Sequence, residues 1–221
     1  MKVLVISVHP DDETLGCGGT ILKHIQNQDE VFWLIMTDVF EKYGYSQKEV
    51  SSEHELVEKV DKAYGFKCRY NLELPAGNIH LINFQEIVIK ISGIINKIKP
   101  DIIYMPNRSD IHTDHQIAAK AILSCTKSFR YPFIKQVLMY ECVSETDAAP
   151  ALIESAFIPN AFSDISDYVD KKVKILELYS QEIGEVPFPR SVENIKALAR
   201  YRGCSVNKLY AEAFMMIKYI F

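Results

Sequence analysis

Apolar residues follow two patterns that alternate along the chain. Continuous apolar runs are typical of strands that helices cover on both faces. They lie at residues 3–8 and 31–36, and further strands are predicted at residues 68–74, 101–105 and 134–142. Between these runs, apolar residues recur at helical spacing. These segments lie at residues 16–28, 49–64, 84–98 and 115–127. Strands and helices that alternate in this way predict an α/β fold with a mostly parallel sheet.

The pattern loosens after residue 145. Residues 169–181 and 192–202 have the spacing of helices, and a turn-rich segment at 184–189 separates them. We therefore expect residues 146–221 to form a helical lobe packed on the sheet, within a single domain of residues 1–221. The predicted fold is a Rossmann-like three-layer α/β sandwich with a mostly parallel sheet and a C-terminal helical lobe.

Composition and charge exclude several classes of protein. The chain has 221 residues, with 25 Lys and Arg against 29 Asp and Glu, and a formal net charge of −4. It has no basic cluster for a nucleic-acid backbone, so we expect no nucleic-acid partner. No apolar run reaches the roughly 18 residues of a membrane span, and the apolar start is too short for a signal peptide. The five cysteines form no CxxC pair, which argues against a disulfide framework and favours the cytoplasm.

Two polar segments follow predicted strands. His9–Glu13 comes directly after the first strand, and Asp110–His115 comes after the fourth. In the common strand order 3-2-1-4-5, strands 1 and 4 are neighbours at the point where the order reverses. Ligands of such sheets bind in the crevice at that point, beyond the carboxyl ends of the strands. The topology therefore predicts that residues about 100 positions apart form one site there.

The residue types in these segments suit a divalent metal ion. Imidazole and carboxylate ligands fit zinc, and a catalytic zinc site uses three protein ligands and leaves a position for water. We expect His9, Asp12 and His115 to hold one zinc ion per chain, with another divalent metal as the alternative. The position of His115 near a helix N-terminus favours the neutral ring that coordination requires.

Three further groups of these segments are candidates for catalysis. Asp11, beside Asp12, is placed to take a proton from the water that the metal activates. His112 could donate a hydrogen bond to a developing oxyanion, and Asp114 could orient His112. Side chains two positions apart do not face each other on a helix, so an Asp114–His112 contact requires the helix to begin at or after Thr113.

Other polar or glycine-rich positions have simpler interpretations. Residues 16–20 lack the spacing of a phosphate-binding loop, and we interpret their glycines as close helix–sheet packing. The chain has no G-x-S-x-G motif for a serine nucleophile. His24, His54 and His80 lie outside both polar segments, and we expect them to be surface or core residues.

The first polar segment is part of a longer motif, VHPDDETLGCGGT at residues 8–20. This motif resembles the signature of the LmbE-like, or PIG-L, family of zinc-dependent N-deacetylases. Residues 110–115 are similar to the second motif of that family. Weaker similarities lie at residues 164–166, 180–181 and 210–214, so the resemblance covers most of the chain.

The resemblance implies a function and residue roles. The family removes the acetyl group from N-acetylglucosamine-type sugars or their conjugates, giving acetate and a free amine. The implied roles are zinc ligand for His9, Asp12 and His115, general base for Asp11, stabiliser of the tetrahedral intermediate for His112, and its carboxylate partner for Asp114. The implied partner is therefore a small amino-sugar molecule. The sequence leaves the oligomeric state open, a homo-oligomer included.

The chain departs from the family pattern at three places. Thr113 stands where proline is common, and Tyr179 where histidine is frequent. The helix from Glu49 lacks the arginine often found near its start, which leaves the group attached to the sugar open. Two alternatives remain: an amidase for another N-acyl or sugar–thiol conjugate, and a non-catalytic nucleotide-binding module, which the missing glycine fingerprint disfavours. Candidates for substrate contact are Arg108, Arg190, Arg202 and Glu212.

Overall fold

The computed structural model describes residues 1–221 and contains one seven-stranded sheet. The strands have the order β3-β2-β1-β4-β5-β7-β6, and the first five of these are mutually parallel. Their bounds are β1 Lys2–Ser7, β2 Glu30–Asp38, β3 Cys68–Pro75, β4 Ile102–Pro106, β5 Gln136–Tyr140, β6 Ala161–Asp164 and β7 Ala211–Tyr219. The predicted order 3-2-1-4-5 is confirmed, with β1 and β4 paired from Val3↔Ile102.

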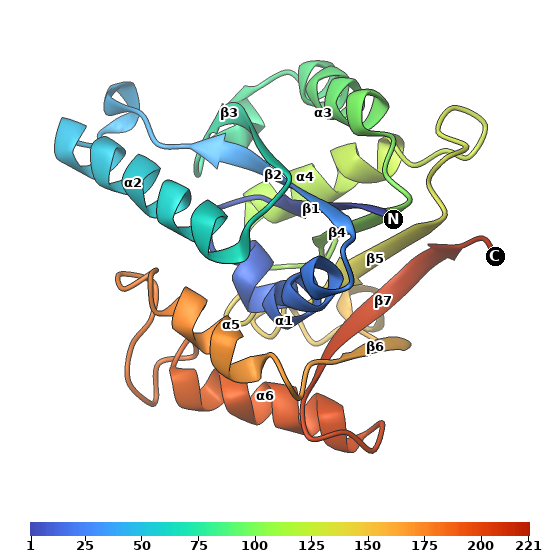
Figure 1. Ribbon diagram of the computed structural model, residues 1–221. Helices are drawn as coiled ribbons and strands as arrows, with labels where there is room; N and C mark the ends of the chain where they lie inside the picture. Colours follow the sequence, from blue (N-terminus) through green and yellow to red (C-terminus); the bar gives the residue numbers. More distant parts are fainter.

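Helices cover both faces of the sheet (Figure 1). The α-helices are α1 Asp12–Gln26, α2 Gln47–Tyr64, α3 Phe84–Ile98, α4 Thr113–Ser124, α5 Val169–Leu176 and α6 Val192–Cys204. Three short 3₁₀ helices lie at Glu41–Tyr43, Ile79–Leu81 and Ile153–Ser155. None of the helices is long and apolar enough to cross a membrane.

The core consists of two layers, one on each side of the sheet. Leu4 and Ile6 of β1 pack in a cluster with α3 and α4, whereas Val3 and Val5 pack in a second cluster with α1, α2, α5 and α6. All four side chains are fully buried. Successive strand residues point to opposite faces, so a strand with helices on both sides must be apolar at every position. This explains the continuous apolar runs in the sequence.

The C-terminal part contains two strands that the pattern did not predict. It holds the expected helices α5 and α6, but β6 and β7 extend the sheet in the antiparallel direction. β6 has only four residues, and β7 changes from buried to partly exposed along its length. Such short or mixed segments carry no clear period. The region is therefore a helical lobe that also completes the edge of the sheet.

The glycines of α1 permit close packing, as the sequence predicted. A Cβ atom on Gly19 would lie 2.7 Å from Ile165 Cγ2, and one on Gly16 would overlap the ring of Tyr140. α1 begins at Asp12, four residues before the predicted start, because the polar segment itself forms its first turn. The motif that follows β1 is thereby fixed at the end of a helix that lies against the sheet.

Candidate active site

The two polar segments meet at the carboxyl ends of β1 and β4. Residues 8–11 connect β1 to α1, and residues 107–112 connect β4 to α4, so both segments lie at the same edge of the sheet, each before the N-terminus of a helix. His9 and His115 are 106 positions apart, yet their Nδ1 and Nε2 atoms lie 3.4 Å from each other. The sheet topology therefore places both segments in one site.

Three donor atoms converge in this crevice. Nε2 of His115 lies 3.4 Å from Oδ1 of Asp12 and 3.4 Å from Nδ1 of His9. The donor atoms of these three residues all lie within 4.8 Å of one another. Asp12 and His115 are buried, whereas His9 is partly exposed toward the cleft. These are the three residues that the sequence proposed as metal ligands.

The outer nitrogens of both rings face carboxylates. Nδ1 of His115 lies 2.9 Å from Oδ2 of Asp110, and Nε2 of His9 lies 3.2 Å from Oδ2 of Asp114. A neutral ring that donates its proton to a carboxylate has a lone pair on its other nitrogen. Both lone pairs then point at each other and at the Asp12 oxygen, an arrangement that a cation stabilises. The residues present therefore fit a bound metal ion, with zinc favoured by two imidazoles and one carboxylate.

The carboxylates also control the charge of His115. Burial lowers the pKa of His115, but Asp12 and Asp110 outweigh this effect and raise it to about 9. Without a metal ion the ring therefore favours its protonated form, contrary to the expectation from the helix N-terminus, and a bound cation would replace that proton. Asp12 itself is held by two backbone N–H groups, from Val8 at 2.8 Å and His9 at 2.9 Å, which donate to its Oδ2. Its Oδ1 remains directed at the two histidines. Asp12 is thus oriented by its own loop before any ion binds.

Asp11 has an unusual backbone conformation. Its φ of 126° lies in a region that residues other than glycine rarely adopt, and such strain is common at functional sites. Nη1 of Arg190 donates to its carboxylate at 2.7 Å. Burial and the neighbouring Asp12 carboxylate raise the pKa of Asp11 well above its usual range, although Arg190 acts in the opposite direction. A carboxylate with a raised pKa is a stronger general base.

A buried glutamate supports this conformation. Oε2 of Glu13 accepts the backbone N–H of Asp11 at 3.2 Å, and its Oε1 accepts the hydroxyls of Thr14 at 2.6 Å and Tyr179 at 2.8 Å. Burial raises the pKa of Glu13 to about 7, against the opposing effect of these hydrogen bonds. Sequence reasoning gave Glu13 only an interaction with the helix dipole and gave Tyr179 no role. No local signal could connect two residues 166 positions apart.

His112 caps the N-terminus of α4. Its Nδ1 accepts the backbone N–H of Asp114 at 3.1 Å, which leaves the proton of the neutral ring on Nε2. Burial and the nearby rings of His9 and His115 lower the pKa of His112. The ring of His112 lies 4.7 Å from that of His9, between centroids. A neutral His112 therefore has an N–H group to offer beside the metal donors.

The carboxylate of Asp114 does not pair with His112 as expected. It accepts hydrogen bonds from His9 and from the backbone N–H groups of Gly77 at 2.7 Å and Ile79 at 3.3 Å. α4 begins at Thr113, as the expected contact required, but the hydrogen bond to His112 comes from the backbone N–H of Asp114 and not from its carboxylate, which lies within 4.8 Å of a His112 ring nitrogen. Asp114 thus touches His112 through its backbone and His9 through its carboxylate.

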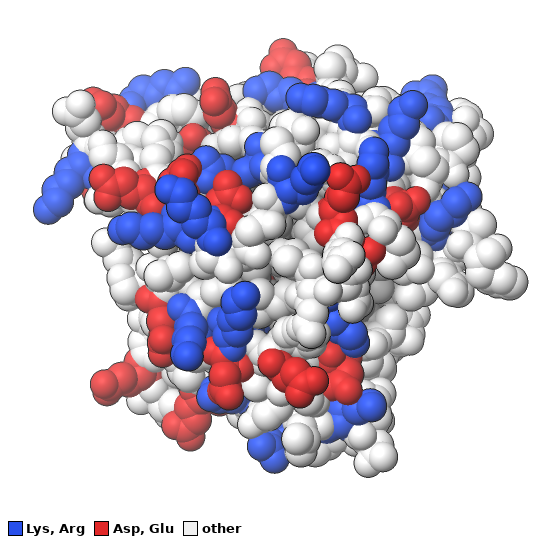
Figure 2. All heavy atoms as spheres, in the orientation of Figure 1, with Lys and Arg blue, Asp and Glu red and all other residues white.

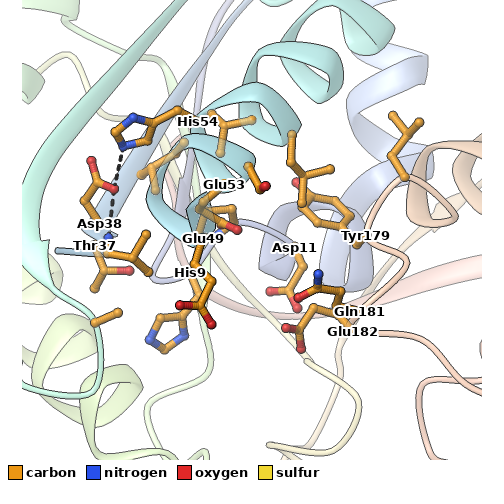
Figure 3. Close-up of a pocket in the computed structure, with 18 of the residues that line it drawn as sticks. His9, Asp11, Thr37, Asp38, Glu49, Glu53, His54, Tyr179, Gln181 and Glu182 are labelled. Atoms are coloured by element: carbon orange, nitrogen blue, oxygen red, sulfur yellow. Dashed lines mark hydrogen bonds and ion pairs between the residues drawn. The ribbon is translucent and has the colours of Figure 1, made fainter. Parts of the chain in front are cut away.

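A cleft of about 1450 Å³ opens from these residues, lined by the end of β2, α2, β3 and the segment after α5. Figure 3 shows His9 and Asp11 at its base, with Asp38, Glu49, Glu53 and Glu182 around them. Of the four suggested substrate contacts, only Arg190 lines this cleft. Arg108 donates to a backbone carbonyl, Arg202 pairs with Glu141, and Glu212 pairs with Lys172 in the core. His54, expected to be a surface or core residue, is exposed and lines the cleft.

Comparison with known families identifies the family of the chain. The PIG-L family model, described as GlcNAc-PI de-N-acetylase, matches residues 4–126, which is more than half of the chain. The chain belongs to the PIG-L family. Members of this family are metal-dependent N-deacetylases, so the protein is an enzyme of the hydrolase class. The matched residues contain both polar segments.

Individual relatives are similar over the full length. A diacetylchitobiose deacetylase of Thermococcus kodakarensis is 26% identical over 100% of this chain and 84% of its own. The N,N'-diacetylchitobiose deacetylase structure from Pyrococcus horikoshii has a TM-score of 0.76 and 20% identity, covering 98% of this chain and 84% of that one. The structure of GalB, a 4-carboxy-2-hydroxymuconate hydratase from Pseudomonas putida KT2440, has a TM-score of 0.73 and 16% identity, with 100% and 97% covered. The two structures show that the fold is shared, and their different reactions show that the fold alone does not fix the substrate.

Proposed function

We propose that the protein is a zinc-dependent hydrolase that removes the N-acetyl group from an N-acetylglucosamine-type amino sugar or its conjugate. The observation that carries this proposal is the convergence of the His9, Asp12 and His115 donor atoms beside Asp11 and His112. Family membership and the diacetylchitobiose deacetylase relative support the substrate class. The five unpaired cysteines favour the cytoplasm as its location.

The roles follow from the positions of the side chains. A bound zinc ion would polarise the acetamide carbonyl and acidify the attacking water. Asp11, with its raised pKa, accepts a proton from that water as its oxygen attacks the carbonyl carbon. The N–H group of His112 donates to the carbonyl oxygen as negative charge develops there. Asp114 orients both histidines, through its carboxylate and through its backbone N–H.

The products require one further proton transfer. The C–N bond of the amide breaks, the water oxygen remains on the acetyl carbon, and the leaving amine takes a proton from Asp11 or His112. Acetate and a free amino sugar result. Asp11 lies beside the proposed metal ligand Asp12 but is not proposed as a ligand itself. A substitution of Asp11 should therefore change turnover without changing metal binding.

Asp11→Asn tests the assignment. We expect zinc content to match that of the unchanged protein and turnover to fall by about 10²–10⁴, the usual contribution of an acid–base group. The measurements are metal analysis and acetate release from a set of N-acetylglucosamine derivatives and other N-acyl compounds. Equal activity of the variant would remove Asp11 as the base. Release of only other acyl groups would favour the amidase alternative.

A further inference from the structure

The cleft beyond the metal donors is rich in carboxylates. Nine of its lining side chains are Asp or Glu and four are Lys or Arg. The whole chain has a net charge of only −4, so the excess of acid is concentrated in the cleft. On the outer face in Figure 2, by comparison, charges of both signs are interspersed. A cleft lined by one sign of charge raises the local concentration of ligands of the opposite sign.

The two arginines of the cleft already face carboxylates. Arg190 already donates to Asp11, Glu182 and Glu145. Arg69 lies between two carboxylates of α2, at 3.5 Å from each. Lys48 and Lys59 are exposed residues of α2. An arriving phosphate would therefore find no arginine without a carboxylate beside it.

Glu53 differs from the other carboxylates of the cleft without a partner, Glu73 and Glu177, because those two are exposed. Glu53 of α2 is half-buried and makes no hydrogen bond or ion pair within the protein (Figure 3). Burial raises its pKa, and the carboxylates of Glu182 and Asp38 add to that effect. By contrast, Glu49 caps α2 through Ser46. A partly buried charge without a partner is unfavourable, so a cationic group in the cleft would stabilise Glu53.

We propose that the cleft selects an N-acetylated amino sugar that carries a second, unacetylated amino group, and that Glu53 binds this ammonium group. A partly deacetylated amino-sugar oligosaccharide has this chemistry, whereas a sugar with phosphate or carboxylate next to the reacting residue is disfavoured. The inference rests on the proposed deacetylase function and specifies its substrate class. It makes Glu53 a specificity residue that takes no part in the bond-breaking step.

The test compares three substrates that differ in charge, using the zinc-loaded protein. They are a chitobiose with one acetyl group and one free amine, N,N'-diacetylchitobiose, and N-acetylglucosamine 6-phosphate. We expect kcat/KM for acetate release to be about fivefold higher for the cationic than for the neutral substrate, the effect of one charge pair at about 4 Å in water. The phosphate should give the lowest value, and added salt should reduce these differences.

Glu53→Gln should lower the ratio of kcat/KM for the cationic to the neutral substrate from about fivefold to about one. Glu55→Gln is the matched control, because Glu55 is an exposed residue of the same helix that does not line the cleft. Turnover of the neutral substrate with no change of charge preference in Glu53→Gln would refute the inference and leave the deacetylase function standing.

A binding measurement keeps the two proposals separate. If no substrate releases acetate, the deacetylase proposal fails, and calorimetry with glucosamine and glucosamine 6-phosphate still tests the charge preference. Tighter binding of glucosamine that weakens in Glu53→Gln would support the ammonium site. Tighter binding of the phosphate would overturn it.

Discussion

Asp110 gives the sharpest test of how the metal donors are oriented. Its Oδ2 lies 2.9 Å from Nδ1 of His115, and its Oδ1 accepts the Thr146 hydroxyl at 2.7 Å, with Asp110 and His115 both buried. Asp110→Asn can keep both contacts, because the amide oxygen can accept from His115 while its NH₂ group donates to Thr146. The substitution thus removes the charge and retains the hydrogen bonds.

The size of the effect follows from these contacts. Carboxylate partners of metal-bound histidines typically contribute about 10–100-fold to metal affinity. Since Asp110→Asn keeps the hydrogen bond, we expect its zinc Kd to rise by about tenfold, near the lower end of that range. Asp110→Ala removes the contact altogether, and its zinc Kd should rise by about 100-fold.

Zinc affinity is measured by competition with a chromophoric chelator at fixed pH, and circular dichroism checks that each variant is folded. Asp167→Asn is a suitable control, because Asp167 is exposed and makes no side-chain hydrogen bond or ion pair. A folded Asp110→Asn and Asp110→Ala pair with the zinc affinity of the unchanged protein would show that Asp110 does not polarise His115. The orientation of the metal donors would then need another explanation.

Two further substitutions test contacts that span the chain. Tyr179→Phe removes one hydrogen bond from Glu13, whose carboxylate holds the backbone of Asp11. We expect kcat to fall by about tenfold, which corresponds to a loss of about 1.4 kcal/mol. The zinc content should stay unchanged. A variant with normal kcat would show that Asp11 needs no such support. Lys172→Met leaves the buried carboxylate of Glu212 without its partner at 2.7 Å, and urea unfolding should show a loss of about 3–5 kcal/mol. An unchanged midpoint would contradict the buried pair.

The fold was largely predictable because its strands are buried on both faces. The apolar runs at residues 3–8 and 31–36 became β1 and β2, and residues 84–98 formed α3 with the predicted bounds. β6 and β7 were missed because their residues alternate poorly between buried and exposed. Their position depends on pairing with distant strands, which a local pattern does not record.

The candidate site also contains residues that the sequence predicts and residues that it does not. His9, Asp12 and His115 could be proposed from residue type and strand order, because each follows a strand that the pattern defines. Asp110 belonged to the second segment, but its contact with His115 depends on how α4 begins. The sequence did not single out Glu53, because glutamate is common on helix surfaces. The only hint of a special role for its helix was the missing arginine near the start of that helix.

The two halves of the chain contribute different properties to the site. The donor atoms for the metal, and His112, come from the residues that the family model matches, 4–126. The groups that adjust Asp11 come from beyond them: Arg190 contacts its carboxylate, and Tyr179 acts through Glu13. Arg190 lowers the pKa of Asp11 against the effect of burial, so the basicity of the proposed base depends on a loop that holds none of the proposed metal ligands. The C-terminal part can therefore change the basicity of Asp11, and with it the pH range of the reaction, while the metal site stays the same.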